Sequence, residues 1–60
     1  MDYYIILISS GDSVFLLGRH GEYLRTIKNA LKFDDIVEAK EYIERRGIEK
    51  IAMTRRVRSA

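Results

Sequence analysis

Four polar residues near the start of the chain have side chains that could support hydrolytic or transfer chemistry. Ser9, Ser10 and Asp12 lie in one short segment, and His20 is the only histidine of the 60 residues. Such chemistry needs a nucleophile beside a base, or paired carboxylates in a pocket. Ser9, Ser10 and Asp12 belong to one predicted turn and His20 to the next, at opposite ends of an up-and-down sheet. We therefore expect turn residues here, no catalytic residue and no enzymatic activity.

Metal and cofactor sites are also not expected. One histidine and no cysteine leave no ligand set for zinc. Gly18 and Gly21 suit a hairpin turn better than a phosphate-binding loop, because no helix follows them directly. The sequence predicts no metal-binding residue, no cofactor and no small-molecule substrate.

Basic residues are concentrated at the end of the chain. Residues 1–44 hold five Lys or Arg against eight Asp or Glu, whereas residues 45–60 hold six against one. Guanidinium groups bind phosphates and carboxylates alike, so this surface could bind an acidic protein or nucleic acid, or only be solvated. The predicted basic contact surface consists of Arg45, Arg46, Lys50, Arg55, Arg56 and Arg58.

The first half of the chain predicts three antiparallel strands. Residues 3–9 and 14–17 form apolar runs on either side of the turn-favouring residues 10–13. A two-residue loop at His20 and Gly21 would place Arg19 opposite Glu22 and Leu17 opposite Leu24, with a third strand over residues 23–27. Residues 28–33 form a polar link that closes the edge of the core.

The second half predicts a helix and a last strand. Asp35 with Glu38 makes a capping-box-like start, and Gly47 follows two basic residues at the end. One face of this helix holds Ile36, Ala39, Tyr42 and Ile43. The last strand covers residues 50–57, and residues 58–60 are expected to fray.

These elements define one α+β domain over residues 1–60, of order β-β-β-α-β. A right-handed crossover would place the last strand beside the first and parallel to it. The result is a four-stranded sheet of order 4-1-2-3 with the helix on one face.

The first strand is apolar on both faces although one helix is available to cover the sheet. A 60-residue chain without cysteine has marginal stability, which oligomerisation would raise. We therefore expect a homodimer or a protein partner, with the interface residues Tyr4, Ile6, Ile8 and Phe15. The alternate set of Tyr3, Ile5 and Leu7 is the other possibility. For the aromatic residues, stacking on nucleic-acid bases is a third alternative to core packing and protein contact.

The line A-L-K-F-D-D-I-V-E-A at residues 30–39, followed by I-E-K-I-A-M at residues 48–53, resembles small uncharacterised proteins of bacteriophages and prophages. The likeness covers about half the chain, as a capped helix with its core residues. It implies a compact accessory protein that binds one host macromolecule, with no catalytic residues to carry over.

The expected function is therefore non-enzymatic: a phage-type accessory protein that binds and modulates a host protein, for example as an inhibitor of host defence. The alternative is a dimer that binds nucleic acid through its C-terminal arginines. No apolar run approaches the roughly 20 residues that span a bilayer, so we expect a cytoplasmic protein without membrane contact.

Overall fold

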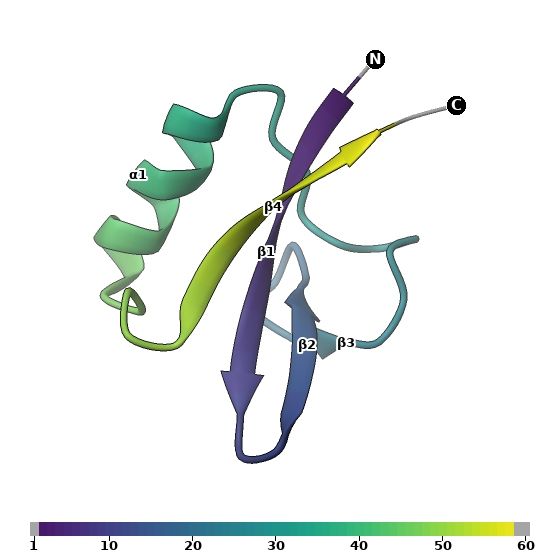
Figure 1. Ribbon diagram of the computed structural model, residues 1–60, viewed down its shortest axis with the longest axis vertical. Coiled ribbons are helices and arrows are strands. Elements are labelled where there is room, and N and C mark those ends of the chain that lie inside the picture. The colour runs from purple at the N-terminus through teal and green to yellow at the C-terminus, as the bar shows by residue number, and fades with distance from the viewer. Residues whose placement is uncertain (1, 59–60) are drawn as a thin grey trace.

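The computed structural model describes residues 2–58 as a four-stranded sheet with a helix on one face (Figure 1). The sheet order is β3-β2-β1-β4. Read from the other edge this is 4-1-2-3, so the predicted α+β class and strand order are confirmed. The elements are β1 (Asp2–Ser10), β2 (Ser13–Leu17), β3 (Tyr23–Leu24), α1 (Ile36–Arg46) and β4 (Ala52–Arg58). Arg58 is the last residue of β4, and residues 59 and 60, which were also expected to fray, lie outside the described range.

The first hairpin forms where the small residues predict it. Ser10 pairs with Ser13, which leaves Gly11 and Asp12 as a two-residue loop. Gly11 has φ 61°, a left-handed conformation that hairpin turns require and glycine adopts without strain. The predicted turn at residues 10–13 is confirmed.

The second hairpin differs from its prediction by one residue in register. Leu24 pairs with Leu16 rather than Leu17, and β3 has two residues instead of the five expected. The Gly18 amide donates to the Glu22 carbonyl at 2.8 Å, so the loop is longer than His20 and Gly21 alone. The Glu22 carboxylate folds back into this loop and accepts from the His20 amide at 2.8 Å, so the predicted cross-strand pair with Arg19 does not form.

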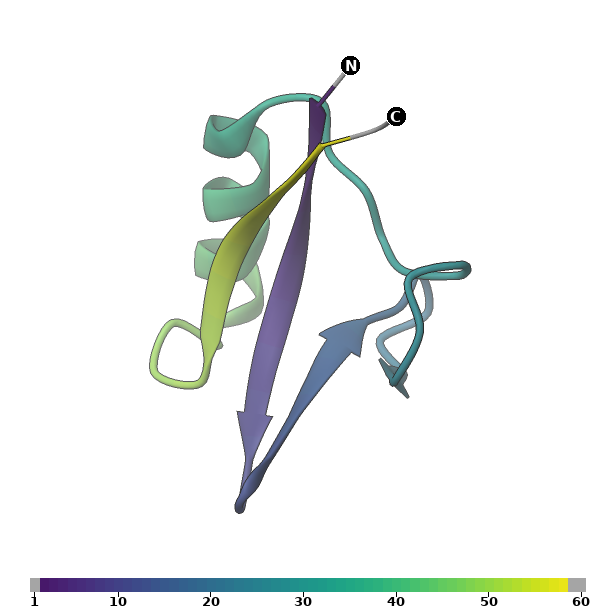
Figure 2. The ribbon, with the colours of Figure 1, turned by 45° about the vertical axis from the view of Figure 1, so that its right-hand side comes forward.

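The last strand runs antiparallel to β1, whereas the sequence predicted a parallel pair. The difference originates in residues 25–35, which return along the edge of β1 that β2 leaves open. Tyr4 and Phe33 exchange backbone hydrogen bonds of 2.8 and 2.9 Å in an antiparallel bridge. This extra pass carries the chain to the start of β1, so α1 begins there and β4 must run back in the opposite direction (Figure 2).

Helix α1 begins and ends at the cap residues that the sequence predicts. Asp35 has φ −130° and ψ 133°, and its Oδ1 accepts from the Val37 amide at 2.9 Å. Gly47 has φ 66°, and its amide donates to the Glu44 carbonyl at 3.1 Å. Ala39 and Ile43 are buried on the predicted apolar face. The predicted N-terminal cap, C-terminal glycine and buried face are confirmed.

The Asp35 cap provides a first stability test. Replacing Asp35 with alanine removes the acceptor for the Val37 amide, and such losses cost about 1 kcal/mol of unfolding free energy. Asp34→Ala is the matched control, because Asp34 is an adjacent exposed aspartate outside the cap. Urea unfolding followed by circular dichroism should show a lower midpoint for Asp35→Ala only. Equal midpoints for the two variants would contradict the capping role.

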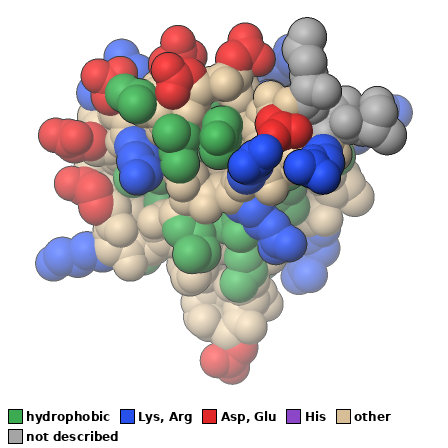
Figure 3. Space-filling model, turned by 45° about the horizontal axis from the view of Figure 1, so that its top comes forward, with side chains coloured by type: hydrophobic (Ala, Val, Ile, Leu, Met, Phe, Trp, Pro, Cys, Tyr) green, Lys and Arg blue, Asp and Glu red, His purple; other side chains and the backbone are tan. Residues whose placement is uncertain are grey.

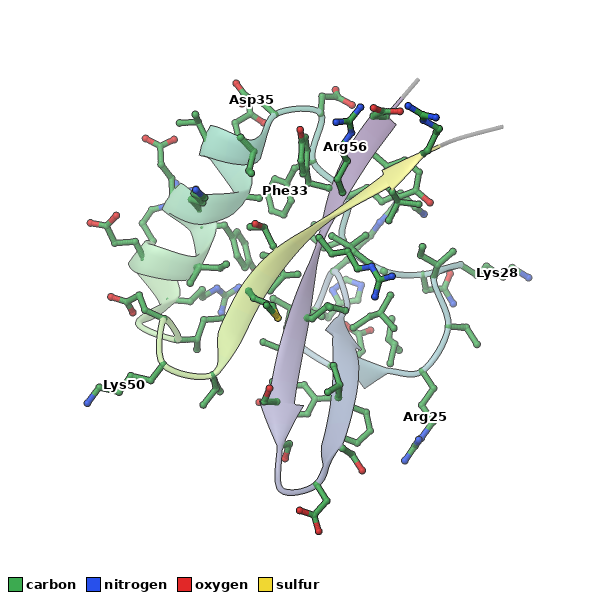
Figure 4. The ribbon with its side chains drawn as sticks, in the orientation of Figure 1. Arg25, Lys28, Phe33, Asp35, Lys50 and Arg56 are labelled. Atoms are coloured by element: carbon green, nitrogen blue, oxygen red, sulfur yellow. The ribbon has the colours of Figure 1, made fainter. Side chains whose placement is uncertain are left out.

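The core lies between the sheet and α1. Ile6, Ile8, Leu17 and Ile43 are each at most 7% exposed, and Phe33, Tyr42, Ile48 and Ala52 pack against them. Phe33 lies between α1 and β1, with its ring 5.5 Å from that of Tyr42 (Figure 4). The even-numbered residues of β1 therefore face the helix, and the odd-numbered ones face the opposite side.

Candidate protein-binding surfaces

The sheet face that α1 leaves uncovered, here the helix-free face, is built by the odd-numbered residues of β1. Their neighbours are given by the strand register, since residues paired across an antiparallel sheet share a face. Leu7 lies between Leu16 of β2 and Met53 of β4, and Ile5 lies beside Arg55. The helix-free face thus combines apolar residues with at least one arginine.

The predicted interface residues Tyr4, Ile6, Ile8 and Phe15 belong to the other face. Ile6 and Ile8 are 0% and 1% exposed, so their assignment to an exposed interface is wrong. The physical reason is that the apolar side of α1 packs on the even-numbered residues of β1. Phe15 is half-buried and stacks on Tyr23 at 5.7 Å, with the Arg25 guanidinium 4.9 Å above its ring. The alternate set of Tyr3, Ile5 and Leu7 is the one on the helix-free face.

Four apolar side chains form what we call the apolar patch, at the hairpin end of the helix-free face. Val14 and Met53 are 57% and 59% exposed, and they flank the half-buried Leu7 and Leu16. Val14 pairs with Ser9, which has the same orientation as Leu7. No charged residue belongs to the patch, so apolar surface is in contact with water at this end of the sheet.

A groove that we call the arginine groove lies at the other end of this face. It has a volume of about 470 Å³. Ile5, which is 3% exposed, lies at its bottom. The remaining lining residues are Leu7, Leu16, Ile27, Val57, Arg25, Arg55, Arg56 and Arg58. Arg25 comes from the loop after β3 and the other arginines from β4, so the fold collects basic residues that are far apart in the sequence.

The six residues of the predicted basic contact surface do not form one surface in the structure. Lys50 and Arg56 lie near opposite ends of β4 (Figure 4). Arg46 lies 5.2 Å above the Tyr42 ring, and Arg56 donates from Nε to Asp2 Oδ2 at 2.7 Å. This hydrogen bond and the Asp2 charge raise the pKa of Arg56. Of the six, only Arg55, Arg56 and Arg58 line the arginine groove. Arg45 and Arg46 lie in the last turn of α1, and Lys50 lies just before the start of β4.

A second groove, here the edge groove, runs between α1 and β4. Its volume is about 430 Å³, and its lining residues are Lys40, Ile43, Glu44, Glu49, Ala52, Met53 and Thr54. Figure 3 shows acidic and basic side chains mixed over α1 at the left, mainly basic ones over the end of β4 at the right, and hydrophobic ones between. Sequence reasoning missed this groove. The predicted strand order nevertheless placed the last strand at a sheet edge, which was the available signal.

The residues considered for catalysis are separated as predicted. Ser9, Ser10 and Asp12 lie at the turn between β1 and β2, and His20 lies in the loop that follows β2 at its opposite end. Within residues 2–58 no three His, Cys, Asp or Glu side chains are grouped so that they could hold a metal ion. Across the same residues, no helix has the length and apolar character needed to cross a membrane.

The loop around His20 predicts a pH effect on stability. The backbone amides of Glu22 and His20 lower the pKa of the Glu22 carboxyl below its ordinary value of 4.5. A lowered folded-state pKa means that the ionised carboxylate stabilises the fold at neutral pH, and that this contribution is lost as the pH falls through that pKa. Glu22→Gln should therefore unfold at lower urea than the wild type at neutral pH, with the difference vanishing in acid. A difference that stayed constant from neutral pH into acid would contradict this role.

Comparison of the chain with known protein families, curated proteins and solved structures finds no match. The apolar patch, the arginine groove and the edge groove are therefore the features from which a function can be inferred.

Proposed function

We propose that this protein is a non-enzymatic binding protein that forms a homodimer through the apolar patch and binds an acidic protein partner through the neighbouring arginines. The observation that supports this proposal is the composition of the helix-free face. Exposed Val14 and Met53 lie at one end, and the arginine groove lies at the other. Apolar surface exposed on a sheet in this way commonly marks a protein contact.

A second copy of the chain is the occupant that best fits the apolar patch. The patch is uncharged and surrounds Leu7, so two patches can pack face to face in a two-fold arrangement. If the β1 strands of the two copies run in opposite directions, the arginine grooves lie at opposite ends of the dimer. Like charges are then kept apart. Leu7 and Leu16 line the arginine groove as well as the patch, so the dimer covers that end of each groove and leaves the end with Arg55 open to a partner.

Arginines in a groove with an apolar bottom suit an acidic protein segment. Arg55 is on the helix-free side of β4, and its guanidinium can form paired hydrogen bonds to a carboxylate, while Ile5 and Val57 offer apolar contact. Nucleic acid is the second candidate, because four arginines line the same groove and could contact phosphates. The two candidates differ in salt dependence, since phosphate neutralisation makes affinity fall steeply as salt rises.

Light scattering of the purified protein, at low and high salt and with nucleic acid removed and then restored, tests this proposal. We expect twice the chain mass of 7.0 kDa at both salt concentrations, because apolar packing is little affected by screening. A monomer at micromolar concentration under all conditions would overturn the homodimer. A mass that rises only when nucleic acid is added at low salt would favour the second candidate.

The setting of this activity, as a phage accessory protein that modulates a host protein in the host cytoplasm, rests on the sequence resemblance alone. Affinity capture from a bacterial host lysate tests it. Repeated recovery of one host protein would support the proposed role, and repeated recovery of nucleic acid alone would count against it.

A further inference from the structure

The outer edge of β4 has backbone groups that no strand of the described residues pairs with. β4 is at the end of the sheet and has β1 as its only neighbour among residues 2–58. The Ser9 amide donates to the Ile51 carbonyl at 2.8 Å, which places the odd-numbered residues of β4 in the hydrogen-bonded positions facing β1. Because these positions alternate, Thr54 and Arg56 direct their N–H and C=O groups away from the sheet. These are the groups that an added strand would bind.

The edge groove lies beside these groups and has an apolar bottom. Ile43 is 7% exposed, and Ala52 and Thr54 are half-buried. Lys40, Glu44 and Glu49 are the charged residues that line the groove. A side chain on the helix-facing side of an added strand would therefore enter an apolar slot opposite Ala52 and Thr54.

Charge selects the kind of strand that fits. Arg55 lies on the helix-free side of β4, and Arg58 lies on the helix-facing side with Arg56, whose guanidinium is paired with Asp2. The second half of the strand is therefore basic on both sides. An added strand next to them gains from acidic side chains. A second β4 does not meet this requirement, because edge-to-edge pairing would bring the three arginines of each copy into one sheet.

We propose that β4 binds an extended acidic peptide segment of the protein partner as a fifth, antiparallel strand. Apolar side chains of the segment enter the edge groove on the helix-facing side, and acidic ones lie beside Arg55 on the helix-free side. This proposal rests on the proposed function and names the chemistry of its partner. The acidic segment then contacts the outer edge of β4, where main-chain hydrogen bonds supply affinity and side-chain pockets supply specificity.

A nonapeptide of alternating valine and glutamate, labelled with fluorescein, is the probe for this mode. Fluorescence anisotropy should show binding that weakens when every glutamate is replaced by lysine. In antiparallel pairing the valines lie opposite Thr54 and Arg56 on the helix-facing side, so their N–H groups point at β4. N-methylation of all valines should weaken binding by about tenfold or more, because each lost hydrogen bond costs about 0.5–1.5 kcal/mol.

The matched probe carries the same modification on the glutamates, whose N–H groups point away from β4. Loss of binding confined to the valine set supports the antiparallel pairing, and loss confined to the glutamates would overturn it in favour of a parallel strand. Equal effects of the two methylation patterns, or no binding of the unmodified peptide, would overturn the proposal. Displacement of the peptide by single-stranded DNA at low salt only would assign the surface to nucleic acid instead.

Two variants test the same contact from the protein side. Thr54→Pro removes an N–H that points outward, a position where an edge strand tolerates proline, whereas Thr54→Val keeps the N–H. Peptide binding should fall about tenfold for Thr54→Pro and stay near wild type for Thr54→Val. If the proline variant does not fold, hydrogen exchange of the wild-type protein is the readout. The peptide should slow exchange of the Thr54 and Arg56 backbone amides. Unchanged exchange at these amides would overturn the proposal. Light scattering of the same samples reports the homodimer separately, so a dimer without peptide binding would refute this inference alone.

Discussion

Replacing Ile6 with alanine is expected to remove a large part of the free energy of unfolding and to lower the urea midpoint strongly. Ile6 is 0% exposed and belongs to the core cluster with Ile8, Leu17 and Ile43. Truncating such a side chain leaves a cavity and costs about 2–5 kcal/mol. A typical stability of roughly 0.05–0.15 kcal/mol per residue amounts to about 3–9 kcal/mol for 60 residues, so the loss removes much of the total. Far-UV circular dichroism with urea titration measures the effect.

Val37→Ala is the matched control for this prediction. Val37 is 55% exposed in α1, so its truncation leaves no cavity in the core. Alanine also has a higher helix propensity than valine. We expect a urea midpoint at or slightly above that of the wild type. If Ile6→Ala kept a wild-type midpoint, Ile6 would not occupy the core position that the structure gives it.

Local signals in the sequence predicted the elements well. The Asp35 cap, the Gly47 end and the small residues at Gly11 and Asp12 each act within a few positions of themselves, so their consequences can be derived from neighbouring residues. The strand order also followed, because the most apolar strand needs neighbours on both edges. These predictions depend on the geometry of neighbouring residues and on burial, which can be inferred from the apolar residues of a strand.

Contacts between distant residues were not predictable in the same way. The antiparallel direction of β4 depends on the bridge between Tyr4 and Phe33, and a polar link gives no sign that it will pair with the first strand. The register of β3 depends on a Glu22 side chain that folds into its own loop. Both are tertiary choices between arrangements that satisfy the same local preferences.

The candidate surfaces show the same division. That one face of β1 would lack a helix followed from its apolar residues, but both alternate sets were apolar, so the pattern could not identify which set was exposed. The arginine groove joins Arg25 to β4 across the helix-free face, and the edge groove joins α1 to β4. Neither combination is visible before the fold is known.

Met53→Glu should convert the proposed homodimer into a monomer. Met53 is 59% exposed in the single chain, so a glutamate there meets water and should leave the fold intact. In the dimer the same residue lies in the apolar patch, and two-fold symmetry places two unpaired carboxylates in one interface. We expect the dissociation constant to rise by about 100-fold or more, equivalent to about 3 kcal/mol. Light scattering over a dilution series measures the mass.

Val37→Glu separates this effect from a general response to added charge. The exposed fraction of Val37, 55%, is similar to that of Met53, but Val37 lies on α1 rather than on the helix-free face. It should keep the dimer mass at every concentration at which Met53→Glu is monomeric. A Met53→Glu variant that remains dimeric would exclude the apolar patch as the interface, and dissociation of both variants would show that net charge, not the patch, controls assembly.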